Sequence, residues 1–312
     1  MTHATASEPY PLVDFELLFD ELRNWGRWGD NDELGTLNFL GPAQVVAACR
    51  LVTQGRRVSL SRHLDTVSGP DNERPALHYM TRMAERSGSE PTFYMDFFAT
   101  DYHGKAVSHL DALCHVAYKG MLYNGRRGDE AVTSAGSSFV PISALASGVV
   151  ARGVLLDAPR ARGVDWLEPP GALSSEDLAG IASALGVEVR RGDVVLVRTG
   201  HVHRRRTLGP WNPDVSSAGL HISSMRFLAD RQVALLGSDG DNDSHPSPVA
   251  GILHPIHVLA MNAMGMCLLD NLDLEGLSSA CEQTGAFEFL LTIAPLIIPG
   301  GTGSPVNPIA IF

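Results

Sequence analysis

Basic residues are scarce in this sequence, and their scarcity excludes one class of partner. The 312 residues carry 24 lysines and arginines against 35 aspartates and glutamates, a formal net charge of −11. A protein that binds the phosphate backbone of DNA or RNA needs a basic surface, so we expect no nucleic-acid partner. Only two lysines occur, Lys105 and Lys119. The one basic run, at 204–206, is predicted to be a solvated loop.

Cysteines are few and long apolar runs are absent, which excludes further classes. No C-x-x-C pair occurs, so the pattern predicts neither a zinc ribbon nor a redox pair. We interpret the four cysteines as small buried thiols of a reducing cytosol. They are Cys49, Cys114, Cys267 and Cys281. No run is long enough to span a bilayer and no signal peptide is evident, so we expect a soluble cytoplasmic protein without a membrane partner.

Motifs of several common enzyme classes are also missing. The sequence contains no G-x-S-x-G nucleophile elbow, no Walker motif and no G-x-G-x-x-G after a predicted strand. What it contains, from residue 149 onward, is an alternation of strand and helix patterns, which predicts an α/β layered fold. We expect an extended N-terminal arm over residues 1–41 and a single catalytic domain over residues 42–312. Residues 66–90 are polar and are predicted to be a long loop.

The expected elements follow from apolar periodicity and from helix-capping signals. Ser174 precedes Asp177 by three residues, the spacing of a capping box, and Gly186 closes the same helix. The predicted helices are 42–52, 174–185, 221–230, 255–264 and 274–283. The predicted strands are 58–60, 149–157, 194–198, 233–237, 266–269, 287–298 and 305–312.

The most informative segment runs from Ser108 to His115 and places two histidines and an aspartate in an apolar run. On a strand, His109 and Asp111 share one face, and both can reach one divalent ion. His115 joins them only if the chain bends or turns helical after Asp111. Burying three titratable groups unpaired is costly, which favours a functional site over core histidines bonded to the backbone. The segment therefore predicts a strand that breaks into a turn at a metal site.

This segment resembles the signature of the metal-dependent cyclase family, which includes bacterial kynurenine formamidases and isatin hydrolases. The family pattern reads His-x-Gly-Thr-His-x-Asp-x-Pro-x-His. Its Thr, second His, Asp and last His align with Ser108, His109, Asp111 and His115. Three positions depart from it: Lys105 for the first His, Val107 for Gly and Leu113 for Pro. The segments that indicate a longer branch of the family are 25–30, 34–38, 103–104, 192–200 and 268–272.

The resemblance carries expectations for the whole molecule. It implies the swivelling β/β/α fold with a mixed sheet, and amide hydrolysis of the formamidase or isatin type. It also implies a homo-oligomer, a dimer or tetramer, in which the N-terminal arm contributes to a neighbour's pocket.

A second half of the metal site is expected near the C-terminus. His254 and His257 lie three residues apart on a predicted helix, and Asp270 ends an apolar strand, where α/β proteins gather their sites. The family carries a His and a Glu as metal ligands in this region, and His257 and Asp270 match them. Aspartate is one methylene shorter than glutamate, so we expect one divalent ion, zinc or manganese, rather than two. The expected ligands are His109, Asp111, His257 and Asp270. The alternative for His257 is a capping or core histidine.

The candidate catalytic residues are His115, Lys105 and His103. His115 is predicted to act as general base toward water and as general acid toward the leaving group. Lys105 could stand in for one metal ion, by neutralising a carboxylate or by polarising a substrate carbonyl. The alternative is an ordinary surface lysine.

Two other polar clusters receive plainer interpretations. The acidic segment 238–243 follows a strand end but lacks the ligand spacing of an EF-hand, so we interpret it as a turn that lies near the site. His201 and His203 have no carboxylate nearby in the sequence and are predicted to be loop residues.

We expect a metal-dependent hydrolase that cleaves an amide, lactam or lactone bond of a small organic substrate. One alternative is a ring-closing cyclase or dehydratase of a biosynthetic pathway, which uses the same acid–base pair without net hydrolysis. Another is a non-catalytic protein that binds a small molecule and has lost part of its metal site, for which Lys105 and Val107 are the only support.

Overall fold

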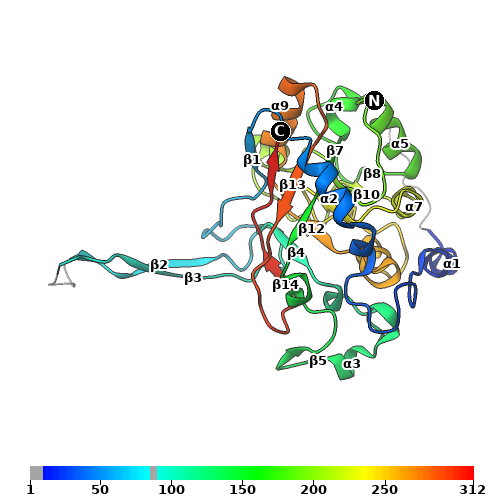
Figure 1. The fold of residues 1–312 in the computed structure, drawn as a ribbon, viewed down its shortest axis with the longest axis horizontal. Helices are drawn as coiled ribbons and strands as arrows, with labels where there is room; N and C mark the ends of the chain where they lie inside the picture. The colour runs from blue at the N-terminus through cyan, green and yellow to red at the C-terminus, as the bar shows by residue number, and fades with distance from the viewer. Residues whose placement is uncertain (1–9, 85–89) are drawn as a thin grey trace.

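A nine-stranded mixed sheet forms the centre of the molecule in the computed structural model, which describes residues 10–84 and 90–312 (Figure 1). Neighbouring strands are parallel from β7 through β9 and β11 to β12, and antiparallel elsewhere. The strand order is β1 (Arg57–Ser59), β15 (Ile309–Ile311), β13 (Glu288–Ile293), β7 (Val149–Asp157), β9 (Val194–Arg198), β11 (Leu235–Ser238), β12 (Leu268–Asp270), β4 (His109–Asp111), β14 (Gly303–Pro305). The mixed α/β sheet expected from the sequence is confirmed.

Helices and three short strand pairs surround this sheet. The helices are α1 (Leu12–Leu22), α2 (Pro42–Cys49), α3 (Gly128–Ala131), α4 (Ala158–Arg162), α5 (Ser175–Ala184), α6 (His201–Leu208), α7 (Ser224–Asp230), α8 (Pro255–His257) and α9 (Glu275–Thr284). Short turns of helix are η1 (Gly35–Phe39), η3 (Leu113–His115), η4 (Tyr123–Gly125) and η5 (Ile142–Leu145), and η6 (Val258–Met264) is a π-helix. The pairs are β2 (Leu77–Arg82) with β3 (Met95–Ala99), β5 (Val132–Thr133) with β6 (Gly136–Ser137), and β8 (Ala172–Leu173) with β10 (Gly219–Leu220).

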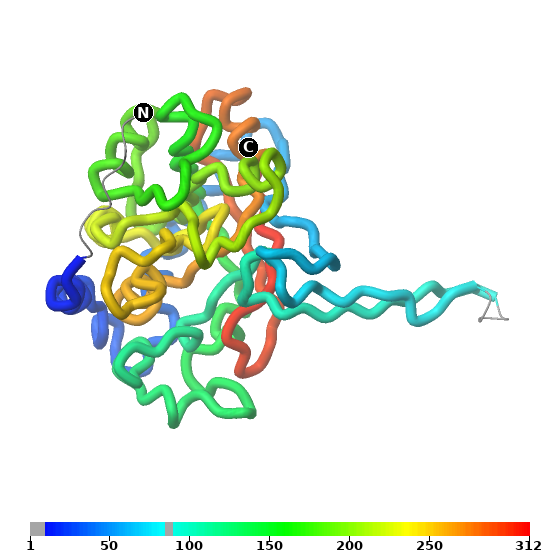
Figure 2. The backbone as a smooth tube through the Cα atoms, turned by 180° about the vertical axis from the view of Figure 1, so that it is seen from behind, coloured from blue at the N-terminus to red at the C-terminus, as the bar shows by residue number. Residues whose placement is uncertain are grey.

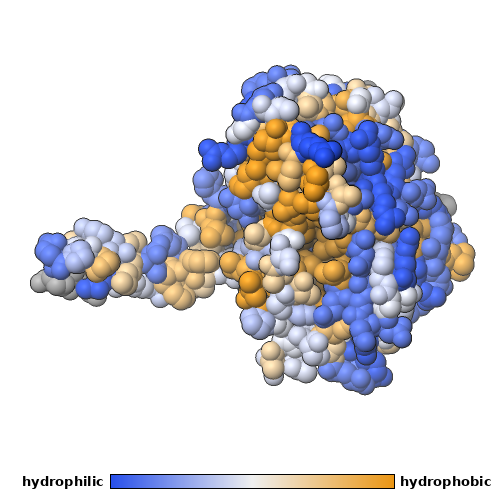
Figure 3. Space-filling model, in the orientation of Figure 1, coloured by the Kyte–Doolittle hydropathy of each residue, from blue (hydrophilic) through white to orange (hydrophobic). Residues whose placement is uncertain are grey.

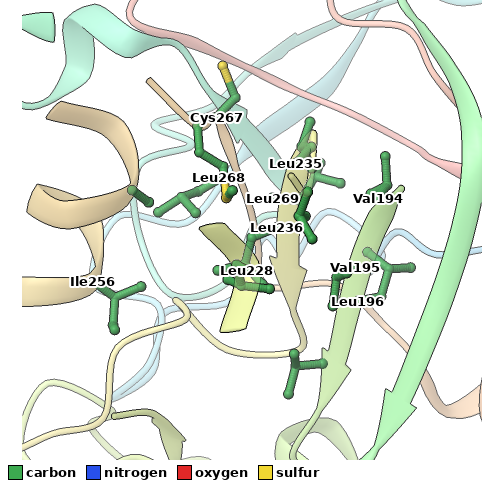
Figure 4. Packing of buried hydrophobic residues seen from close by; sticks show 14 of the residues in the cluster. Val194, Val195, Leu196, Leu228, Leu235, Leu236, Ile256, Cys267, Leu268 and Leu269 are labelled. Carbon is green, nitrogen blue, oxygen red and sulfur yellow. The ribbon is translucent and has the colours of Figure 1, made fainter. Parts of the chain in front are cut away.

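The parallel strands form the core because their sequences are apolar on both faces. Every residue of β9 and β11 is buried, and Figure 4 shows Val194, Leu196 and Leu235 packed among neighbours from adjoining strands and helices. A near-continuous apolar run of this kind is typical of a strand covered on both sides. No described helix is long and apolar enough to cross a membrane.

Three expectations from the sequence are wrong about local structure. Part of the N-terminal segment is helical, because Leu12–Leu22 forms α1 and buries an apolar face against η6. The predicted loop over 66–90 contains β2, which pairs with β3 in a hairpin that projects far from the body (Figures 1 and 2). His201, His203 and the arginine run 204–206 lie on α6 rather than in a loop. Ion pairs to Asp71 and Asp273 hold Arg205 and Arg206 on this helix.

The predicted capping box of α5 is confirmed. The Ser174 hydroxyl accepts a hydrogen bond from the Asp177 backbone N–H at 3.2 Å, and the Asp177 carboxylate accepts one from the Ser174 N–H at 2.8 Å. The two side chains thus satisfy backbone donors that the first turn of a helix leaves unpaired.

Ser174→Ala should therefore lower the free energy of unfolding by about 1 kcal/mol, because it removes the acceptor for one of these donors. Urea denaturation followed by circular dichroism measures the change. Ser183→Ala, at an exposed position of the same helix, is the matched control and should cause no loss. Equal stability of Ser174→Ala and the unaltered protein would contradict the capping role.

Candidate metal centre

The residues predicted from the sequence as site residues come together around β4 and β12, next to the edge strand β14. Residues of β4 and β12 pair directly, His109 opposite Asp270, and Asp111 follows on the same strand as His109. The chain turns into η3 after Ala112, so the predicted break beyond Asp111 is present. Helix α8 supplies His257. These side chains line a cavity of about 360 Å³ together with His103, Lys105, His115 and His254.

Four side chains form a closed ring of contacts inside this cavity. His109 Nε2 lies 3.5 Å from Asp111 Oδ1 and 3.9 Å from Asp270 Oδ2. His257 Nε2 lies 3.7 Å from Asp111 Oδ2 and 3.4 Å from Asp270 Oδ2. Two ligands held about 2.1 Å from one zinc ion in tetrahedral geometry lie about 3.4 Å apart. The four contacts are close to this spacing, and the donor atoms fall into two possible ligand triads that share Asp111: one with His257 and Asp270, the other with His109 and His103.

Hydrogen bonds at the far side of each imidazole orient the two histidines toward the ring. Nδ1 of His109 lies 2.8 Å from the Val107 carbonyl oxygen, which accepts its proton. Nδ1 of His257 lies 2.6 Å from Asp243 Oδ2, which accepts likewise. Nδ1 of each ring is therefore the donor on the outer side, and Nε2 faces the carboxylates. Such outer partners usually fix the tautomer of metal-binding histidines.

Asp111 shows that the ring fits a cation. Its side chain is fully buried, and among residues 10–84 and 90–312 no donor makes a well-aligned hydrogen bond to either carboxylate oxygen, although His103 Nδ1 lies 2.9 Å from Oδ1. Burial alone would raise the pKa of Asp111, but His109 and His103 outweigh burial and hold this pKa below its usual range. A buried carboxylate without hydrogen bonds is costly unless a positive charge lies beside it. The ring of two imidazoles and two carboxylates supplies donors that both zinc and manganese accept.

The negative charge in the cavity also changes the pKa of His257. Burial opposes protonation of its ring, but hydrogen bonds to Asp243 and Asp270 raise the pKa of His257 well above the ordinary histidine value. The pocket thus attracts positive charge at the Nε2 face, as a proton or as a metal ion.

His103 and His115 form a stacked pair beside the ring. Their ring centroids are 3.9 Å apart and their planes are nearly parallel. His103 places Nδ1 2.9 Å from Asp111 Oδ1 and Nε2 2.9 Å from the Thr302 hydroxyl, so it makes a second ligand triad with His109 and Asp111. Burial, assisted by the neighbouring imidazoles, lowers the pKa of His115 to about 4. His115 is therefore neutral near pH 7, in the state that accepts a proton.

Lys105 lies apart from the ring and neutralises a different carboxylate. Its ammonium group contacts the buried Asp241 and lies 2.9 Å from Asp214. Burial would lower the pKa of Lys105, but the two aspartates raise it above its ordinary value, so the side chain stays charged. Lys105 still lines the cavity, but the side chain in contact with Asp111 is that of His103 and not that of Lys105.

Asp241 and Asp243 have roles that were not predicted from the sequence. Asp243 accepts hydrogen bonds from the backbone N–H groups of Ile256 and His257 and from the His257 ring. It therefore fixes the position of the first residues of α8. Asp241 lies 3.1 Å from His245 Nε2. Both follow β11, and their position after a strand end was the signal that could have identified them. We interpreted 238–243 as a turn near the site, and the acidic side chains of this segment are buried.

Asp243→Asn should weaken binding of zinc or manganese about 10- to 100-fold, because the amide keeps the shape but lacks the charge that polarises the His257 ring. Competition with a chromophoric chelator measures the affinity. Asp230→Asn, at an exposed position of α7, is the matched control and should bind metal like the unaltered protein. Equal affinity of the two variants would contradict the role of Asp243.

Known structures share this fold. A crystal structure described as a novel cyclase is 29% identical, covers 94% of this chain and 99% of its own, and has a TM-score of 0.84. Isatin hydrolase A from Ralstonia solanacearum is 22% identical, and the match covers 86% of this chain and 95% of the hydrolase, with a TM-score of 0.57. A predicted metal-dependent hydrolase from Bacillus stearothermophilus is 14% identical, and the match covers 83% of this chain and 98% of that protein, with a TM-score of 0.51. At such low identity, these last two show the fold alone. A search of curated proteins found no match.

A family model gives the assignment. The model described as "Putative cyclase" matches residues 57–242, more than half of the chain. The match contains the segment from His103 to His115 on which the resemblance was based, and it ends before α8. The family expected from the sequence is thereby confirmed, as is the mixed α/β fold that the novel cyclase shares. The chain belongs to the cyclase family that this model describes.

Proposed function

We propose that the protein is a metal-dependent hydrolase that cleaves an amide, lactam or lactone bond of a small organic molecule. The observation that carries the proposal is the ring of His109, Asp111, His257 and Asp270 in one cavity, with the carboxylate of Asp111 fully buried. The shared fold with isatin hydrolase supports the same reading, since isatin is a small cyclic amide.

The four ring residues would hold one divalent ion, as expected from the sequence. When bound, such an ion polarises a carbonyl group and makes water more acidic. Asp243 keeps His257 in the tautomer that presents Nε2, and the Val107 carbonyl does the same for His109. The chain thus supplies a site whose geometry is set before a substrate arrives.

His115 is the residue we assign to proton transfer. Its imidazole is neutral, lines the cavity and is held flat against His103. A neutral imidazole nitrogen takes a proton from the attacking water and then gives it to the leaving nitrogen or oxygen, so the net reaction adds one water to the substrate. The hydrogen bond from Thr302 and the contact with Asp111 fix the ring of His103, which in turn fixes the ring of His115.

Lys105 has an electrostatic part in this proposal. It neutralises Asp241 at the far side of the cavity, which leaves the negative charge of Asp111 and Asp270 to the ion. This is the first of the two roles considered for its ammonium group.

The purified protein, loaded with zinc or manganese, should contain one ion per chain by inductively coupled plasma mass spectrometry. Asp111→Asn should contain none, because it removes a charge from the centre of the ring. His103→Ala should keep its ion if the ring of four holds it. Two ions per chain in the unaltered protein would contradict a single ion held by these four residues. So would a His103→Ala variant that contains no ion. Asp129→Asn, an exposed aspartate, is the matched control.

His115→Ala should keep the ion and lose about 10²- to 10⁴-fold in kcat, because the proton acceptor is absent. The assay is hydrolysis of a panel of cyclic amides and lactones that includes isatin, with product mass as readout. A product heavier by one water identifies hydrolysis, and a product without added water would indicate the cyclase or dehydratase alternative. Full turnover by His115→Ala would exclude His115 as the acid–base residue.

A further inference from the structure

Lys105 is a charged side chain that the protein largely removes from water. Hydrophilic side chains cover much of the outer surface of the body in Figure 3, where water solvates their charges. The side chain of Lys105, by contrast, is only 17% exposed. Its ammonium group contacts Asp241 and lies 2.9 Å from Asp214 Oδ1. A cation removed from water needs anionic partners, so these two carboxylates determine what else the ammonium group can bind.

The two carboxylates differ in how firmly they are held. The side chain of Asp241 is buried, and its Oδ2 also lies 3.1 Å from His245 Nε2. The side chain of Asp214 is 59% exposed, and Lys105 is the one ion-pair partner of its carboxylate within residues 10–84 and 90–312. An exposed ion pair contributes little to stability. Asp241 is therefore the fixed partner of Lys105, and Asp214 is the partner that another anion can replace.

Asp214 meets Lys105 at the junction of two cavities. Lys105 and His254 line the cavity of about 360 Å³ that contains the ring of His109, Asp111, His257 and Asp270. They also line a second cavity of about 270 Å³, and Asp214 lines this second cavity with exposed residues such as Glu73 and Arg74. The ammonium group thus borders both the ring's cavity and a more open one.

The surroundings of Asp214 suit a bound carboxylate. Its carboxylate meets the ammonium group of Lys105 and lies within 4.8 Å of a ring nitrogen of His245 and of His254. Nδ1 of His254 is buried and makes no hydrogen bond within the described ranges 10–84 and 90–312. The place that Asp214 occupies therefore has an ammonium group and an unpartnered imidazole nitrogen close to one carboxylate.

Charge determines which ligand can take this place. A carboxylate that replaces Asp214 leaves Lys105 with the same number of negative partners. A neutral oxygen makes a weaker hydrogen bond, because bonds between an ammonium group and a carboxylate are charge-assisted. A cationic group is repelled by the ammonium group itself. The place is therefore suited to an anionic group of a ligand.

Apolar side chains line the cavity in which this ligand would lie. They are Val116, Ile252, Leu253 and Val258. Small-molecule sites usually combine such apolar walls with a few polar groups that fix orientation. A substrate of matching character has its reacting bond at the ring, an apolar body and an anionic group at Lys105.

We propose that Lys105 determines specificity by binding a carboxylate of the substrate in place of Asp214. The substrates are then small cyclic amides or lactones whose apolar body carries an anionic group. This inference rests on the hydrolase function proposed above and narrows its substrate class. Asp214 competes with the substrate for one ammonium group, so one carboxylate replaces another when the substrate binds.

Hydrolysis of matched substrates by the metal-loaded full chain tests the role of Lys105. The pairs are isatin-5-carboxylate with 5-nitroisatin and isatin-6-carboxylate with 6-nitroisatin, because a nitro group has the shape of a carboxylate without its charge. The ratio of kcat/KM within a pair is compared between variants, which cancels the different reactivities of the two compounds. Lys105→Met should lower this ratio about 10- to 100-fold, and Lys105→Arg should retain most of it, because the charge is kept.

Asp214→Asn tests the competition separately. It should lower KM for the carboxylate substrate about 2- to 5-fold without a change in kcat, because an exposed ion pair no longer has to be broken. Asp129→Asn is the matched control, since Asp129 is 67% exposed, pairs with Arg127 at 2.6 Å and lines neither cavity. It should leave KM unchanged.

Binding of compounds without a hydrolysable bond separates this inference from the proposed function. Isothermal titration calorimetry with indole-5-carboxylate and 5-nitroindole should show tighter binding of the carboxylate, and Lys105→Met should remove the difference. Hydrolysis of neither isatin pair would count against the proposed function, while this titration would still decide the role of Lys105.

Three outcomes would overturn the inference. One is a Lys105→Met variant that keeps the ratio of the unaltered protein. Another is a KM for the carboxylate substrate that does not change in Asp214→Asn. The third is carboxylate binding that persists in Lys105→Met and requires added zinc or manganese, which would assign the anionic group to the ion instead.

Discussion

The structure of the site depends on one buried charge. The carboxylate of Asp111 is fully buried, which is unfavourable unless positive charge lies beside it. Imidazoles from β4 and α8 face this carboxylate, and Asp243 and the Val107 carbonyl turn these rings toward it. The sheet contributes rigidity, because β4 and β12 are paired through the ligands themselves.

The rest of the cavity is organised around the same negative potential. Lys105 compensates Asp241 and so separates a second buried carboxylate from the ion site. His115 is kept neutral by burial and by its imidazole neighbours, so one of its ring nitrogens carries no proton near pH 7. The site therefore combines two environments a few ångströms apart, one that favours positive charge and one that disfavours it. In the proposed reaction, the first environment would hold the ion and the second would hold the proton acceptor.

The strand that holds His109 and Asp111, and the start of α5, could be predicted from the sequence, because the residues that determine each are close together in the chain. Period-two alternation placed His109 and Asp111 on one strand face, and the capping box of α5 required only Ser174 and Asp177. The hairpin arm could not be predicted, since its strands lack the buried face that makes alternation visible. Nor could the pairing of Lys105 with Asp241, 136 residues later, because that contact exists only once β4 and β11 share a sheet.

The direct test of this account is an anomalous-difference map from crystals of the protein loaded with zinc or manganese. We expect one peak within coordination distance of His109 Nε2, His257 Nε2 and the carboxylates of Asp111 and Asp270. Absence of any peak after loading would contradict it, as would a peak only at the separate group of Asp214, His245 and His254.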